Sequence, residues 1–85
     1  MENIGENIRK IRILLDMKQA VMAKMLNLSV NFYGKIERNE VEIKPERLIQ
    51  IAKIFEVDLK YIINFRLFLE SLKFNPLKRI NNEKD

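Results

Sequence analysis

The side chains that most often carry out covalent chemistry are missing from this 85-residue sequence. It contains no cysteine and no histidine, which excludes thiolate nucleophiles, histidine general bases, catalytic triads and the usual zinc sites. Carboxylates are present, but pairs such as Glu40 and Glu42 have no metal-binding neighbours in the sequence. Two glycines in the whole chain cannot build a glycine-rich phosphate loop. The residue types therefore predict a protein that is not an enzyme and that uses no metal or cofactor.

The chemistry that remains is ionic contact and hydrogen bonding. Sixteen Lys and Arg side chains against twelve Asp and Glu give a net charge of +4. An excess of positive charge favours a polyanionic partner, although four charges are a weak signal by themselves. No apolar run approaches the ~20 residues that span a bilayer, and the chain does not start like a signal peptide. The composition therefore predicts a single cytoplasmic domain with no membrane partner.

Helical spacing of apolar residues predicts the elements that must position the polar side chains. Two glycines and two prolines interrupt the chain, and no segment alternates with period two. Five helices are expected, with Ser29 and Asp58 as N-caps and Pro45 in a first turn. The fifth is expected to continue without a break over residues 59–74. The inward-facing residues are expected to be Ile4, Ile8, Ile11, Leu15, Met22, Ala23, Met25, Leu26, Tyr33, Ile36, Leu48, Ile51, Ala52 and Phe55. The pattern predicts an all-α fold.

Residues 19–38 combine a short helix, a tight turn and a second helix. Ala23 lies midway along the first helix, and only a small residue allows two helices to cross closely there. Asn27 suits a left-handed turn, and Tyr33 and Ile36 anchor the second helix. This arrangement leaves the second helix free to enter the DNA major groove, whose ~12 Å width accepts a helix.

These residues, with residues 8–12 before them and residues 48–58 after them, resemble the phage-repressor and Cro-like helix-turn-helix family (the xenobiotic-response-element class). The resemblance extends over residues 4–64, and the sequence is also similar to controller proteins of restriction–modification systems. It implies a five-helix repressor-like domain over residues 1–64. Residues 65–77 would form an extended C-terminal helix and residues 78–85 a flexible tail.

The resemblance also assigns roles to particular side chains. Arg12 and Glu37 correspond to a structural ion pair between the first helix and the recognition helix. The residues implied to read DNA bases are Val30, Asn31, Phe32 and Lys35. The residues implied to contact the DNA backbone are Lys18, Gln19, Ser29, Arg38 and Asn39.

Several positions depart from the family pattern. Lys18 replaces a Ser or Thr cap, and Asn27 and Asn39 replace frequent glycines. Gly34 lies inside the recognition helix, where glycine costs ~1 kcal/mol relative to alanine. The largest departure is an acidic loop that contains Glu40, Glu42 and Glu46. Carboxylates in this loop would weaken DNA binding unless the loop is turned away from the phosphates.

The function implied by the resemblance is a transcriptional regulator that binds double-stranded DNA sequence-specifically and represses as a homodimer. The apolar C-terminal stripe is expected to form the dimer surface through Phe65, Phe68, Leu69 and Leu72. The stripe has a second interpretation, in which it folds back onto its own domain. The function also has an alternative: an antitoxin or antirepressor that binds a protein partner through its helical surface and binds DNA weakly.

Overall fold

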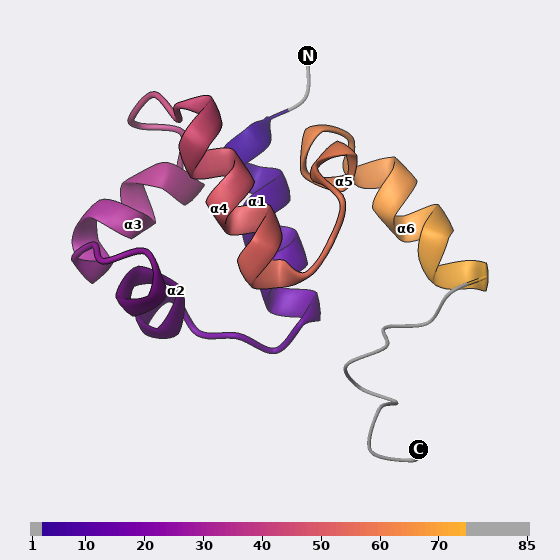
Figure 1. Cartoon of the computed structure of the whole chain (residues 1–85), viewed down its shortest axis with the longest axis horizontal. Coiled ribbons are helices and arrows are strands. Elements are labelled where there is room, and N and C mark those ends of the chain that lie inside the picture. The colour runs from indigo at the N-terminus through magenta and orange to yellow at the C-terminus, as the bar shows by residue number, and fades with distance from the viewer. Residues whose placement is uncertain (1–2, 75–85) are drawn as a thin grey trace.

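The computed structural model of the chain describes residues 3–74, which form six helices and no strand. The helices are α1 (Ile4–Leu14), α2 (Gln19–Met25), α3 (Val30–Glu37), α4 (Pro45–Phe55), α5 (Leu59–Ile63) and α6 (Phe65–Phe74). In Figure 1, α4 lies across α1, with α2 and α3 on one side and α5 and α6 on the other. Helix α2 packs on α3, α1 joins α3 to α5, and α5 contacts α4 and α6. The all-α prediction is confirmed.

A single core joins all six helices. Most of the residues expected to face inward do so, which confirms the helical spacing. Met25 is an error in that prediction, because its side chain is 57% exposed. The buried face of α2 passes through Met22, Ala23 and Leu26, and Met25 falls outside that stripe on the solvent side. The buried apolar residues are Ile8, Ile11, Leu15, Met22, Ala23, Leu26, Tyr33, Ile36, Ile51, Ala52, Phe55, Ile62 and Phe68.

The C-terminal helical region is divided in two, whereas the sequence pattern suggested one continuous helix. Asn64 lies between α5 and α6 with an extended backbone (φ −134°, ψ 98°). Its side-chain oxygen accepts a hydrogen bond from the Arg66 backbone N–H at 3.1 Å, which starts a new helix. The change of direction lets α6 turn back towards the domain, and Phe68, at 2% exposure, enters the core.

Aromatic side chains hold α6 in place. The Phe68 ring lies 5.8 Å from the Tyr61 ring and 5.9 Å from the Phe65 ring, measured between centroids. The Lys10 ammonium on α1 lies 5.3 Å from the Phe65 ring centroid, within the range of a cation–π contact. The helical part of the predicted extension therefore shares the core of the domain. Residues 75–77 and the predicted tail, residues 78–85, lie outside the described residues.

Four non-glycine residues adopt a left-handed backbone at helix ends. Asn27 (φ 61°) and Asn39 (φ 60°) follow α2 and α3, as expected from the tolerance of asparagine for this region. Asp16 (φ 59°) and Glu56 (φ 60°) do the same after α1 and α4; aspartate shares the tolerance of asparagine for this region, and glutamate does not. Both glycines, in contrast, have negative φ and lie within helices.

The first glycine permits a close crossing of α1 over the end of α3. A Cβ atom on Gly5 would lie 2.3 Å from the Ile36 carbonyl oxygen and 2.8 Å from that of Glu37. Both atoms belong to the backbone and cannot rotate away. The Gly5 N–H donates to the Asn39 side-chain oxygen at 3.0 Å, which fixes this contact.

We expect Gly5→Ala to lower the free energy of unfolding by about 1–3 kcal/mol, because the added methyl group forces the α1–α3 crossing apart. Gly34→Ala is a matched control within α3. A Cβ there would meet the movable guanidinium end of Arg38 at 2.9 Å, so we expect a gain of about 0.5–1 kcal/mol. Urea unfolding followed by circular dichroism measures both. Equal effects of the two substitutions would contradict the special role of Gly5.

No helix within residues 3–74 is long and apolar enough to cross a membrane. The same part of the chain contains no group of three or more acidic side chains arranged to hold a metal ion.

Candidate nucleic-acid interface

Helices α2 and α3 meet at a tight, fully bonded turn. Ala23 is buried where the two helices cross, and its carbonyl oxygen accepts a 2.8 Å hydrogen bond from the Leu28 N–H. Asn27 takes the left-handed backbone in this turn. Ser29 then caps α3, with its hydroxyl oxygen accepting from the Phe32 N–H at 3.0 Å. The turn therefore holds α3 at a fixed angle to α2.

The outer face of α3 carries the side chains predicted to read DNA bases. Val30, Asn31 and Phe32 are exposed and Lys35 is partly exposed. Asn31 and Lys35 are four residues apart and share one face of the helix. The other four residues of the helix, Tyr33, Gly34, Ile36 and Glu37, are buried. One side of α3 is thus committed to the core and the other presents an amide and an ammonium group to solvent.

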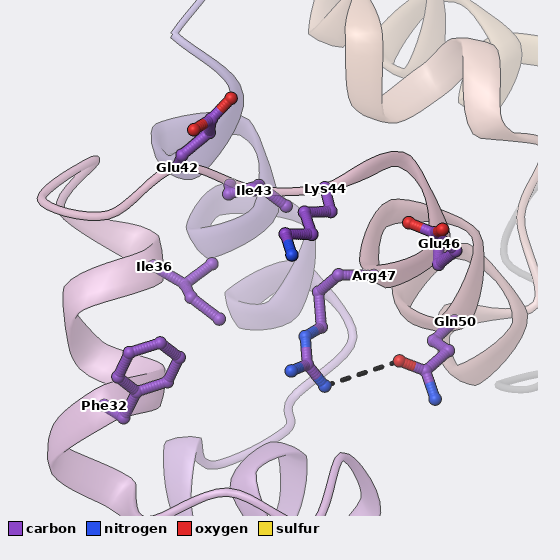
Figure 2. Close-up of a pocket in the computed structure, with 8 residues that line it drawn as sticks. All are labelled: Phe32, Ile36, Glu42, Ile43, Lys44, Glu46, Arg47 and Gln50. Carbon is purple, nitrogen blue, oxygen red and sulfur yellow. Dashed lines mark hydrogen bonds between the residues drawn. The ribbon is translucent and has the colours of Figure 1, made fainter.

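Phe32 lies at the edge of this face, beside a pocket between α3 and the start of α4. The pocket has a volume of about 410 Å³, and Figure 2 shows Phe32 and Ile36 on its α3 side. Arg47 extends into it from α4 and donates to the Leu26 carbonyl and to Gln50, both at 3.4 Å. Phe32 is consequently 39% exposed and packs partly within the protein. The pocket is lined by Phe32, Ile36, Glu42, Ile43, Lys44, Glu46, Arg47 and Gln50.

Two of the side chains predicted to contact the DNA backbone have partners inside the protein. The Gln19 amide donates to Glu37 Oε1 at 2.9 Å. The Asn39 side chain accepts from the Gly5 N–H and donates to the side-chain oxygen of Asn3, the N-cap of α1. Gln19 therefore ties α2 to α3, and Asn39 ties the end of α3 to the start of α1.

Lys18 and Ser29 remain available at the surface. Lys18 is the exposed N-cap residue of α2 and forms no side-chain cap bond, which agrees with its replacing a Ser or Thr in the family pattern. Ser29 uses its oxygen to cap α3, but its hydroxyl hydrogen can still donate. Both groups lie near the helix-turn-helix and can hydrogen-bond a phosphate oxygen.

Arg12 and Glu37 form a buried, two-pronged ion pair between α1 and α3. Arg12 Nε lies 2.6 Å from Glu37 Oε2, and Arg12 Nη2 lies 3.1 Å from Oε1. Arg12 Nη1 also donates to the Met17 carbonyl at 2.8 Å. The Arg12 side chain is 11% exposed and that of Glu37 only 1%. Because Gln19 on α2 also donates to Glu37, this one carboxylate joins α1, α2 and α3.

This pair changes the acid–base properties of its members. Burial opposes ionisation of Glu37, but hydrogen bonds led by Arg12 outweigh it, so the pKa of the carboxyl lies below its ordinary value of 4.5. The same hydrogen bonds, opposed by burial, raise the pKa of Arg12. The neighbouring Tyr33 hydroxyl is buried without a hydrogen-bond partner among the described residues, and burial raises the pKa of Tyr33.

We expect this carboxylate to make the fold acid-sensitive. Because the folded pKa of Glu37 is lowered, its stabilisation is complete above the unfolded value near 4.5 and is lost as pH falls through the folded pKa. The urea midpoint of the native protein should therefore fall as the pH drops below about 4.5. Glu37→Gln should be less stable at pH 7 and show a shallower fall. Parallel curves for the two proteins would contradict the assignment.

Arg38 and Glu40 form a second ion pair, this one exposed. Arg38 Nε lies 2.9 Å from Glu40 Oε2, and the two side chains are 54% and 50% exposed. The Arg38 guanidinium lowers the pKa of Glu40. Glu40 of the acidic loop thus pairs with Arg38, a residue that the resemblance implied to contact the DNA backbone.

Several positions that organise the interface were missed in the sequence. Asn7 is buried in α1 and donates to the Ile62 carbonyl at 2.8 Å, which joins α1 to the end of α5. Asn3 and Gly5 fix the start of α1 against α3. Their only sequence signal is a polar residue or a glycine within an apolar helical pattern.

The four residues predicted to form a dimer surface divide between core and surface. Phe68 is buried in the core, and Phe65 and Leu72 pack against it partly covered. Leu69 is the one member of the set that is exposed, at 45%. For Phe68, the second interpretation of the stripe holds, because this side chain folds back into the core of its own domain.

Comparisons with known proteins agree with this geometry. A helix-turn-helix family profile matches residues 8–62. The chain is also similar to the P22 c2 repressor protein, whose crystal structure was determined in complex with synthetic operator 9T in the presence of Tl+. The two chains share 31% sequence identity, and the TM-score is 0.63. The match covers 73% of this chain and 94% of the repressor chain. A search of curated protein sequences gave no significant match. The chain belongs to the Cro/C1-type family of DNA-binding helix-turn-helix proteins.

Proposed function

We propose that this protein is a transcriptional regulator that binds double-stranded DNA sequence-specifically and represses as a homodimer. The observation that carries the proposal is the outer face of α3, where Asn31 and Lys35 point to solvent from a helix held by a capped turn. Membership of the helix-turn-helix family and likeness to an operator-bound repressor support it.

In this proposal the side chains of α3 divide the work of recognition. The Asn31 amide can donate to and accept from an adenine edge at the same time, and Lys35 can donate to a guanine edge or a phosphate. Val30 and the exposed part of Phe32 can contact thymine methyl groups. Lys18 and Ser29 supply backbone contacts from the turn, and the lysine makes that part of the affinity salt-dependent.

A second copy completes the reading of an operator. Helix α3 has eight residues and can read only a few base pairs, so specificity requires two copies at half-sites about 34 Å apart. Phe65, Leu69 and Leu72 follow one another at helical spacing along α6, and Leu69 is exposed. This edge of α6 is the proposed contact, with Phe68 beneath it as support.

Two substitutions on α6 test the dimer. Leu69→Glu should convert a dimer to a monomer in light scattering at micromolar concentration and leave the helical signal intact. Leu67→Glu is the control, because Leu67 is equally apolar and exposed but lies about 200° around the helix from Leu69. A native protein that is already monomeric at these concentrations would remove the dimer from the proposal.

Selection from a random duplex library at near-physiological salt tests the function itself. We expect enrichment of a two-fold symmetric site whose half-site spacing matches one turn of DNA. If the folded protein enriches no sequence, the proposal that it is a sequence-specific DNA-binding regulator is wrong.

The second candidate is an antitoxin or antirepressor that binds a protein. The exposed apolar side chains Val30 and Phe32 favour it, and Phe32 lines a pocket with Glu42 and Glu46 of the acidic loop. Under this function duplex DNA would bind with a shallow salt dependence, and Val30→Ser with Phe32→Ser would abolish partner binding. The library selection separates the two functions.

A further inference from the structure

Arg38 lies where the recognition face of α3 ends. It is the C-cap residue of the helix, three residues after Lys35 and seven after Asn31, so the three side chains share one face. A guanidinium group on this face would be expected to hydrogen-bond DNA phosphates.

The guanidinium of Arg38 is instead held from two sides within the chain. On one side it lies over Gly34, where an added Cβ would be 2.9 Å from Nη1 and 3.7 Å from Cζ. A Cβ at position 34 would come too close to Nη1, so the guanidinium would have to shift from this place. On the other side, Nε and Nη2 lie 2.9 and 3.5 Å from the two Glu40 carboxylate oxygens. We call these three residues the Arg38 clamp.

The Glu40 carboxylate presents to Arg38 the same chemistry as a DNA phosphate. Both are anions with paired oxygens that accept two parallel N–H donors from a guanidinium. Arg38 cannot offer the same N–H groups to both at full strength. The pair also carries no net charge, so it adds nothing to the attraction of the interface for the DNA backbone.

We propose that Gly34 and Glu40 are positioning residues for Arg38, and that Glu40 stands in for a DNA phosphate and lowers the affinity of the protein for duplex of any sequence. The inference rests on the proposed DNA binding. The acidic loop would then increase selectivity. When contact with the DNA backbone is reduced, the base contacts made by Asn31 and Lys35 must supply a larger share of the binding energy.

The experiment measures binding of the full chain to a random-sequence duplex over a series of salt concentrations. Glu40→Gln keeps the size of the side chain and frees Arg38. We expect affinity to rise about two- to fivefold, as for loss of a competing exposed ion pair. The plot of log affinity against log salt should steepen by about 0.9, because one more phosphate is neutralised.

Glu42→Gln is the matched control, since it removes the same charge two residues further along the loop. Glu42 forms no ion pair within residues 3–74, so its substitution should change affinity less and leave the slope unchanged. An Arg38→Gln background provides the second control, in which Glu40→Gln should have no effect. Equal effects of the two loop substitutions, or an effect of Glu40→Gln that persists without Arg38, would overturn the proposal.

A measurement without DNA separates failure of the clamp from failure of the proposed function. The Arg38 Nε–H signal in NMR spectra of the free protein should move in Glu40→Gln and in Gly34→Ala, and stay in place in Glu42→Gln. If the chemical shift of this signal is unchanged in Glu40→Gln, Glu40 does not hold Arg38 in the free protein, and the proposed clamp is wrong whether or not the protein binds DNA. If the signal moves and neither the native protein nor Glu40→Gln binds duplex, both the clamp's role and DNA binding are overturned.

Discussion

Replacing Arg12 with methionine is expected to lower the free energy of unfolding by about 3–5 kcal/mol, because it breaks a buried ion pair. The substitution keeps the aliphatic stem but leaves the Glu37 carboxylate, 1% exposed, without its two-pronged partner. The Gln19 amide, at 2.9 Å, is a neutral donor and compensates only in part. A domain of this size has a total stability of about 4–13 kcal/mol, so the variant should be near its unfolding limit.

A double-mutant cycle distinguishes loss of the pair from loss of packing. Arg12→Met with Glu37→Met should be less destabilised than the sum of the two single variants by several kcal/mol, because no buried charge is left alone. Arg9→Met is the control on the same helix. Its partner Glu6 is 3.7 Å away and both are solvent-exposed, so the loss should stay below about 1 kcal/mol. Additive effects in the urea-unfolding cycle would show that the pair contributes nothing as a unit.

Replacing Asn31 and Lys35 together with alanine should abolish recognition of the selected operator. A good bidentate contact to a base is worth about 1–3 kcal/mol of discrimination. Loss of Asn31 alone should therefore weaken operator binding by about 5- to 150-fold, and its binding to random duplex much less. Because Asn31 is exposed and Lys35 partly so, thermal unfolding should change little. Fluorescence anisotropy with both duplexes measures the difference.

The role of Lys35 can be resolved within the same series. If Lys35 contacts a phosphate, Lys35→Ala alone should make the salt dependence shallower by about 0.9. If it contacts a base, operator preference should fall instead. Lys53→Ala, at an exposed position on α4, removes the same charge elsewhere and should leave operator preference intact. Operator binding that survives the Asn31→Ala, Lys35→Ala variant would remove α3 as the reading element.

The sequence predicted the parts of this fold that local chemistry determines. Ser29 as a cap, Asn27 in a left-handed turn and Ala23 at a helix crossing all follow from one residue type and its neighbours. The division at Asn64 could not be predicted in the same way. Ile62, Phe65, Phe68 and Leu72 keep a helical spacing across it, and one extended residue leaves that spacing unchanged.

Helical spacing places the side chains of the candidate site that point outward. Asn31 and Lys35 lie on the face of α3 opposite Tyr33, and the helical period is enough to place them. Gln19 and Asn39 have internal partners 18 and 34 residues away in the chain. Those partners depend on how α1, α2 and α3 are packed, which no local pattern of residue types contains.

Helix α1 is synthesised well before several of the residues that it contacts. Three of its polar partners lie far along the chain: Glu37 is 25 residues beyond Arg12, Asn39 is 34 beyond Gly5, and Ile62 is 55 beyond Asn7. During synthesis α1 leaves the ribosome before these partners, so Ile8 and Ile11 stay uncovered until the later helices follow. Closing such long loops costs conformational entropy before the contacts form. We expect α1 to be the last of the six helices to gain protection from hydrogen exchange during folding, although it precedes the other five in the sequence.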